Sequence, residues 1–177
     1  MCENIVSFTE RLYSNRDFQY YLSYVDRKYW ENKLINAIKD IGIDNLTDFN
    51  YATCFSLFVY PSDIGVKLSI GGRNFANYLA EHKVLNAVMI RISAIAPYSV
   101  IHYWKYEHAD EGNKLTESAH SLDEFTQRVG EGIKDFLQQF DVKQIPEECL
   151  NIVVPDISLE LKEENATIFN CLFEDNY

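Results

Sequence analysis

The pattern of hydrophobic and polar residues divides the chain into helical and extended stretches. Near the N-terminus, Ile5, Phe8 and Leu12 recur at spacings of three and four, which is typical of the buried face of a helix. A second helical tract is predicted from Arg16 to Ile41, with Gly42 as its C-terminal stop. The sequence IDNLTDFN that follows is predicted to be a loop, because Asn and Asp side chains readily bond to their own backbone.

From Tyr51 onward, the pattern changes to aromatic and β-branched residues, which are typical of strands. A strand is predicted from Tyr51 to Tyr60, because Pro61 would interrupt the hydrogen bonds of a sheet. The sequence PSDIG is predicted to connect it as a hairpin to a second strand, VKLSI. A short helix is predicted at about residues 74–83.

The clearest sheet signal is a pair of strand-like runs, VLNAVMIRISAIA and YSVIHYWKYEH, on either side of Pro97. We expect them to be adjacent antiparallel strands. In the first run Val88, Ile90, Ile92 and Ala94 share one face, since side chains alternate along a strand.

An amphipathic helix is predicted after the polar stretch that follows these runs. Ser121 begins the sequence SLDE, a capping box, and apolar residues then recur at helical spacing through Phe140. Gly130 and Gly132 each weaken a helix by about 1 kcal/mol relative to alanine, which indicates close packing or an exposed face there.

In the C-terminal region, ISLEL and ATIFNCLF flank the charged turn KEEN and are predicted to form a final hairpin. The chain therefore reads as helices, strands, a helix and strands again, an order that favours an α+β fold. We expect N-terminal helices, a central antiparallel sheet, an amphipathic helix at about residues 122–140 packed on the sheet, and C-terminal strands. No boundary divides residues 1–177, so we expect one domain.

The negative charge is unevenly distributed along the chain. The net charge is −11, and residues 107–177 alone carry 17 acidic and 5 basic residues. Residues 1–50 carry 8 acidic and 6 basic residues, and residues 51–106 carry 2 and 5. This distribution opposes binding to nucleic acid or an anionic membrane and favours a basic partner, although acidity of this kind also serves solubility.

Cys2, Cys54, Cys149 and Cys171 are scattered without metal-binding spacing, which favours reduced thiols that act as small hydrophobic residues. No apolar stretch is long enough to span a membrane, and the start of the chain has no signal-peptide pattern. We therefore expect a cytoplasmic protein.

No established catalytic, cofactor or metal motif is present in the sequence. The four histidines have no ligand spacing, and no serine lies in a GxSxG elbow. The sequence GGRN at residues 71–74 resembles a phosphate-binding turn only weakly, and GxGxxG and GxxxxGK are absent. We predict no catalytic residue, no cofactor and no metal.

Tyrosine is abundant, with 12 residues, seven of which lie in FQYYLSYVDRKYW and PYSVIHYWKYEH. Tyrosine and tryptophan dominate interface hot spots, and they also pack between helices and sheets. In its size, its acidity, its order of helices and sheet, and its tail ENATIFNCLFEDNY, the chain resembles the immunity proteins that bacteria encode beside polymorphic toxins.

That resemblance implies neutralisation of a toxin by tight, stoichiometric binding. A nuclease toxin holds phosphates in a basic groove, so acidic side chains on a rigid edge would take the place of nucleic acid. The candidate residues for binding such a partner follow from charge and aromatic placement: Tyr103, Trp104, Tyr106, Glu107, Asp110, Glu111, Glu174 and Asp175.

Two other classes of function stay open. An enzyme with an unrecognised acid/base pair would use Glu107 with His108 or His102, and convergent polar groups in a pocket would support it. A structural or regulatory subunit would instead present a large apolar patch. The sequence indicates no oligomeric state.

Overall fold

The computed structural model describes residues 1–15, 26–110 and 112–174. In chain order its helices and strands are α1 (Cys2–Asn15), α3 (Tyr29–Ala37), β1 (Ile41–Asn45), β2 (Cys54–Pro61), the 3-10 helix η1 (Ser62–Ile64), α4 (Arg73–His82), β3 (Val84–Ser93), β4 (Tyr98–Glu107), β5 (Lys114–Ser118), α5 (Glu124–Gln138), β6 (Lys143–Gln144), α6 (Glu147–Leu150) and α7 (Ile168–Leu172).

The strands form one sheet in the order β1-β2-β3-β4-β5, and all neighbours on this path are antiparallel. β6 adds a short parallel pairing to β4, in which Tyr98 lies opposite Lys143. β3 and β4 pair along nearly their full lengths. The prediction of an α+β fold with β3 and β4 as antiparallel neighbours is therefore confirmed.

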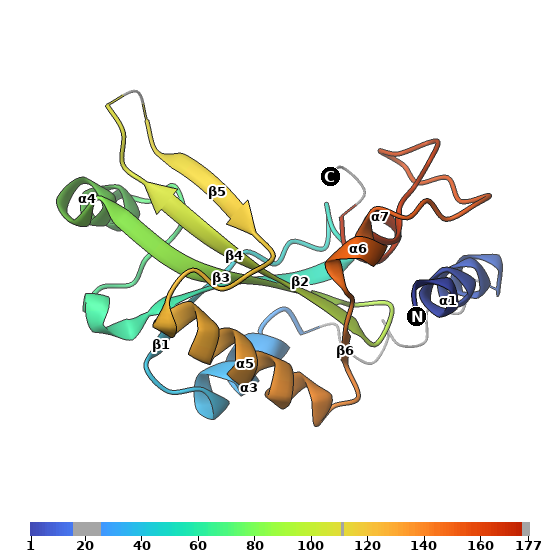
Figure 1. Cartoon of the computed structure of the whole chain (residues 1–177), viewed down its shortest axis with the longest axis horizontal. Helices are drawn as coiled ribbons and strands as arrows, with labels where there is room; N and C mark the ends of the chain where they lie inside the picture. The colour runs from blue at the N-terminus through green and yellow to red at the C-terminus, as the bar shows by residue number, and fades with distance from the viewer. Residues whose placement is uncertain (16–25, 111, 175–177) are drawn as a thin grey trace.

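One face of the sheet, which we call the helix-covered face, is packed against α3 and α5 (Figure 1). Its strand side chains are apolar, and Val88, Ile90, Ile92 and Ala94 share it as expected. Trp30 and Leu34 of α3 are buried against it, and helix α5 contributes Val129, Ile133 and Leu137. This face is one continuous apolar core.

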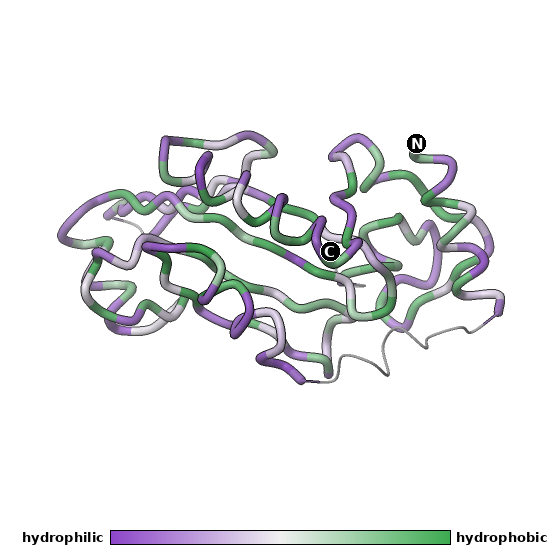
Figure 2. The backbone as a smooth tube through the Cα atoms, turned by 90° about the horizontal axis from the view of Figure 1, so that it is seen from below, coloured by the Kyte–Doolittle hydropathy of each residue, from purple (hydrophilic) through white to green (hydrophobic). Residues whose placement is uncertain are grey.

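The opposite face, which we call the divided face, is covered at its two ends by different elements (Figure 1). At one end, α4 and residues 64–70 pack over an apolar cluster centred on Phe58. At the other end, α1, α6 and α7 pack over a second cluster that includes Cys54 and Val100. In Figure 2, other segments of the backbone lie on both sides of the sheet, whose strands are mainly hydrophobic. Polar sheet residues lie between the two clusters.

The N-terminal half departs from the expectations in two segments. Part of the tract predicted as helix from Arg16 to Ile41 lies outside the described residues, and its last residue begins β1 rather than ending a helix. The segment VKLSI is not a strand. Its backbone is held by side chains instead, because Tyr60 accepts a hydrogen bond from the amide of Leu68 and Asp44 accepts one from Ile70. The helix expected at 74–83 is confirmed as α4.

Helix α5 is confirmed, but its cap lies two residues later than predicted. Asp123, not Ser121, is the N-cap, and its carboxylate accepts a hydrogen bond from the amide of Thr126 at 2.8 Å.

The two glycines of α5 differ in the space that a side chain would have. A Cβ at Gly130 would collide with the ring and hydroxyl of Tyr103, whereas one at Gly132 would make only ordinary contact with Ile38. Gly130 therefore allows the close approach of α5 to the sheet.

The predicted C-terminal hairpin is wrong. Residues 168–172 form α7, which begins at the N-cap Thr167, and ISLEL has no strand structure. A single bridge, between Val153 and Thr167, is the remnant of pairing in this region. All five residues of α7 are buried. The sequence of a short helix that is buried on all sides has no polar face, so its pattern resembles that of a buried strand.

The cysteines are not all reduced, which corrects the prediction. Cys2 and Cys149 form a disulfide that ties α1 to α6. Cys54 and Cys171 are free and buried, as expected of small hydrophobic residues. Within the described part of the chain, the helices are too short or too polar to cross a membrane.

Candidate functional site

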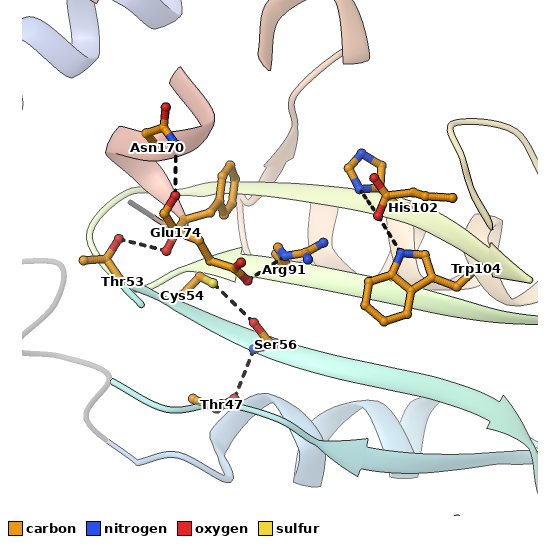
Figure 3. Close-up of polar contacts among 11 residues, drawn as sticks. Thr47, Thr53, Cys54, Ser56, Arg91, His102, Trp104, Asn170 and Glu174 are labelled. Carbon is orange, nitrogen blue, oxygen red and sulfur yellow. Dashed lines mark hydrogen bonds and ion pairs between the residues drawn. The ribbon is translucent and has the colours of Figure 1, made fainter. Parts of the chain in front are cut away.

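Four side chains form a strip across the middle of the divided face, and we call them the central strip: Ser56 of β2, Arg91 of β3, and His102 and Trp104 of β4 (Figure 3). Ser56 lies opposite Arg91 in the β2–β3 register. Arg91 is 5% exposed and His102 is 3% exposed. Polar groups this deeply buried require partners, and the partners come from the surrounding elements.

Arg91 binds the C-terminal segment to the sheet. Its Nε donates to Oε1 of Glu174 at 2.8 Å, and its guanidinium lies between the rings of Trp104 and Phe169, 5.7 and 5.5 Å from their centroids. The carbonyl of Phe173, one residue before Glu174, accepts a hydrogen bond from the amide of Thr53 at 2.9 Å. An arginine held by a carboxylate and two aromatic faces is oriented as well as neutralised.

His102 lies between two glutamates from different elements. Its Nε2 is 2.9 Å from Oε2 of Glu147 in α6, and its Nδ1 is 3.3 Å from Oε2 of Glu117 in β5. The indole of Trp104 donates to the same oxygen of Glu117 at 2.5 Å. Burial lowers the pKa of His102, but the two carboxylates raise it by more, so the pKa lies above its ordinary value.

A cavity of about 250 Å³ opens beside one end of the central strip. Arg91 and Trp104 of the sheet and Glu174 of the C-terminal segment line it, and Asp48 and Tyr51 line it from the β1–β2 connection. It therefore joins two carboxylates, one paired arginine and two aromatic rings.

No protein-family model, curated protein or solved structure matches this chain.

The aromatic candidates predicted from the sequence do not share one surface. Tyr103 faces α5 on the helix-covered face, while Trp104 and Tyr106 lie on the divided face. Tyr106 is buried there, with its ring 4.9 Å from that of Phe75. Trp104 is thus the one member of this group that lines the cavity by the central strip.

The acidic candidates are also dispersed. Glu107 ends β4 and accepts a hydrogen bond from Lys105 at 2.8 Å, which holds the pKa of Glu107 below its usual value. Asp110 is exposed beyond the end of this strand. Glu174 is at the central strip with Trp104, and Glu111 and Asp175 lie outside the described residues.

Sequence reasoning missed Arg91, Glu117 and Glu147, and it treated His102 only as an acid/base suspect. A signal was available in Arg91 and His102, because charged or ionisable residues inside strongly apolar strands are almost never buried without a partner. The partners of His102 could not be identified, because Glu117 lies in an exposed strand and Glu147 in a four-residue helix far along the chain.

The chemistry of the central strip is that of paired charges. Both ring nitrogens of His102 face carboxylates, and burial raises the pKa of the Cys54 thiol to about 12, which disfavours the nucleophilic thiolate. Among residues 1–15, 26–110 and 112–174, no group of three histidine, cysteine or acidic side chains could hold a metal ion. These contacts hold the side chains of the central strip in fixed orientations, and Asp48 and Glu174 give the neighbouring cavity an acidic lining.

Proposed function

We propose that this protein is a non-catalytic binding module of the immunity-protein type, which neutralises a cognate bacterial toxin by tight, stoichiometric binding. The partner is a basic protein, and the binding surface is acidic with aromatic anchors. The observation that carries the proposal is that most acidic side chains in residues 107–177 are exposed and form no ion pair with a described residue. Such charges are available to another molecule.

Most acidic residues of this region are exposed and form no ion pair with any described residue: Asp110, Glu124, Glu131, Asp135, Asp141, Glu148, Asp156, Glu160, Glu163 and Glu164. Four of them lie in residues 155–164, which we call the acidic loop. Its Leu161 is 57% exposed. An exposed apolar side chain among carboxylates is the composition expected of a contact surface for a basic protein.

The negative field supports the proposed mode of action. Unpaired carboxylates attract a basic surface over the Debye length of about 8 Å at physiological salt, which speeds association. The cavity by the central strip adds a place for an anchor, because Tyr51 is 69% exposed at its edge and Trp104 lines its wall. A basic side chain entering there would find Asp48 and Glu174.

The central strip gives less support to an enzyme. His102, the histidine with carboxylate partners, is buried, with Nε2 2.9 Å from Glu147 and Nδ1 3.3 Å from Glu117. The alternative acid/base pair of Glu107 and His108 has Glu107 bound to Lys105 and the His108 ring within 3.1 Å of Asn113. These contacts favour orientation and stability over proton transfer to a substrate.

A cytoplasmic location is part of the proposal, and the disulfide between Cys2 and Cys149 is the observation that opposes it. Disulfides persist mainly in oxidising compartments. Alkylation of thiols in intact cells, followed by mass spectrometry, distinguishes the two cases. Alkylated Cys2 and Cys149 would support a reducing cytoplasm, and a linked pair would place the protein elsewhere.

The test of function measures association with the protein encoded by the neighbouring gene. The variant Glu160→Gln/Glu163→Gln/Glu164→Gln removes three negative charges from the acidic loop. The matched control, Glu3→Gln/Glu10→Gln/Asp40→Asn, removes three from residues 1–50. At low salt we expect the first variant to slow association by about tenfold, since steering contributes 10-fold or more to such rates, and the control to match the parent protein.

Two results would contradict the proposal. One is that no neighbouring gene product binds in a pull-down with the full chain. The other is an association rate that falls equally in both variants, because net charge rather than the C-terminal surface would then be responsible. A toxin that is bound but keeps its activity would indicate a structural or regulatory subunit instead.

A further inference from the structure

A second cavity, of about 590 Å³, lies at the junction of α1, β4, α5 and β6. Ile5 of α1, Tyr98 of β4 and Pro146 form apolar walls, and Lys134 of α5 and Lys143 of β6 contribute ammonium groups. In Figure 1, β6 runs between the end of α5 and α1. Its volume lies within the range of about 300–1,000 Å³ that is usual for small-molecule sites.

The walls of this cavity are held by bonds between elements distant in sequence. Tyr98 and Lys143 are partners in the parallel pairing of β4 with β6, and the amide of Lys143 donates to the carbonyl of Pro97 at 3.0 Å. The ring of Phe8 in α1 contacts the ring of Tyr98 edge-on, with centroids 5.4 Å apart. The disulfide of Cys2 and Cys149 fixes α1 beside α6. Such a cavity is largely formed before a ligand arrives.

The charge of the cavity is opposite to that of the protein. Lys134 and Lys143 line it, and the described lining residues include no aspartate or glutamate. Neither lysine forms an ion pair with a described carboxylate, although the chain has a net charge of −11. The amides of Gln138 and Gln144 add hydrogen-bond donors. Two unpaired ammonium groups above apolar walls match an anion that carries an apolar body.

Burial supports the apolar character of the inner wall. Burial raises the pKa of the Tyr98 hydroxyl. The positive charge of Arg11, in α1, lowers the pKa of the same group by a smaller amount. The hydroxyl is therefore in a poorly hydrated place near positive charge. An anionic head would lie toward the lysines and an apolar body toward Tyr98 and Ile5.

We propose that this cavity binds a small free carboxylate with an apolar body, such as a medium-chain fatty acid. The carboxylate forms charge-assisted hydrogen bonds with Lys134 and Lys143, and the chain packs against Ile5, Tyr98 and Pro146. This site is separate from the acidic loop and from the cavity by the central strip, so it does not depend on the proposed binding of a toxin.

The test uses a pair of fluorescent probes that share one apolar body. The first, 8-anilinonaphthalene-1-sulfonate, carries an anionic group, and the second, N-phenyl-1-naphthylamine, lacks it. We expect the anionic probe to bind the full chain at least about tenfold more tightly, because only this probe can form charge-assisted hydrogen bonds with Lys134 and Lys143. Octanoate should displace the bound anionic probe, and octylammonium should not.

Matched variants locate the binding. Lys134→Gln/Lys143→Gln removes the two lysines of the cavity, and Lys39→Gln/Lys67→Gln removes two exposed lysines elsewhere. The first should weaken binding of the anionic probe by about tenfold or more, and the second should leave it unchanged. Gln138→Trp, which fills the cavity from its exposed edge, should abolish binding without lowering the thermal midpoint.

Equal binding of the anionic probe by the parent and by Lys134→Gln/Lys143→Gln would overturn the proposal. Failure of octanoate to displace the probe would overturn it as well. Displacement by octanoate and octylammonium alike would assign the cavity to apolar ligands without a charge requirement, which also contradicts it. None of these outcomes bears on toxin binding, so the two proposals fail independently.

Discussion

The two faces of the sheet are built from the same three central strands but are stabilised differently. The helix-covered face is a continuous apolar layer in which α3 and α5 pack on residues such as Leu57 and Ile90. The divided face has apolar clusters only at its ends, and its middle contains Arg91 and His102. One face depends on shape and the other on paired charge.

The difference shows where a fold has room for function. Apolar packing is non-directional, so the helix-covered face needs only complementary volumes. The central strip requires specific partners, and it takes them from α6, β5 and the C-terminal segment, which are otherwise far apart in the chain. Glu174, the partner of Arg91, also lines the cavity, so the C-terminal segment contributes both to the central strip and to this cavity.

The largest expected effect comes from breaking the pair of Arg91 and Glu174. Glu174→Gln removes the carboxylate that pairs with the buried guanidinium of Arg91 and should lower the free energy of unfolding by about 3 kcal/mol. Replacement of both partners, Arg91→Met/Glu174→Leu, should restore most of that loss. Urea denaturation measures both values, and the exposed Glu148→Gln is the control. If Glu174→Gln costs no more than Glu148→Gln, the divided face does not depend on this pair.

The next effect tests shape on the helix-covered face. Gly130→Ala introduces a Cβ into the ring of Tyr103 and should destabilise the protein by about 1–3 kcal/mol, despite alanine's higher helix propensity. Gly132→Ala, two residues along the same helix, meets only ordinary contact and should stabilise by up to about 1 kcal/mol. The midpoints of thermal unfolding of the two variants measure these changes in stability. A gain in stability at both positions would mean that α5 does not need its close approach to β4.

The same contrast explains which elements could be predicted from the sequence. The helix-covered face was accessible because its pattern is periodic: Val88, Ile90 and Ile92 alternate, and Val129 and Ile133 recur at helical spacing. The edge strand β1 has only two apolar residues, Ile41 and Ile43, which is too short a pattern to identify a strand, and the edge strand β5 is almost wholly exposed. The buried helix α7 has no polar face, so its pattern could not be separated from that of a strand.

The candidate site was predictable only in part, for a related reason. Trp104 and Glu174 were identified from their chemistry, and they do lie together at one cavity. Tyr103, adjacent in sequence to Trp104, points to the other face because neighbouring side chains alternate in a strand. Contacts such as His102 with Glu147 join segments 45 residues apart, and no local pattern records them.

The smallest effect concerns pH and the pairing of His102. Its raised pKa means that folding favours the protonated ring, so this stabilisation is present below the unfolded pKa of about 6.5 and is lost as pH rises through the folded value. His102→Gln should therefore cost about 1 kcal/mol more at pH 5.5 than at pH 9. Urea denaturation across that range measures the difference, with His120→Gln as an exposed control. A cost that is constant with pH would show that folding does not raise the pKa of His102. A cost that is smaller at pH 5.5 than at pH 9 would show that the folded protein keeps the ring neutral, without an ion pair at this position.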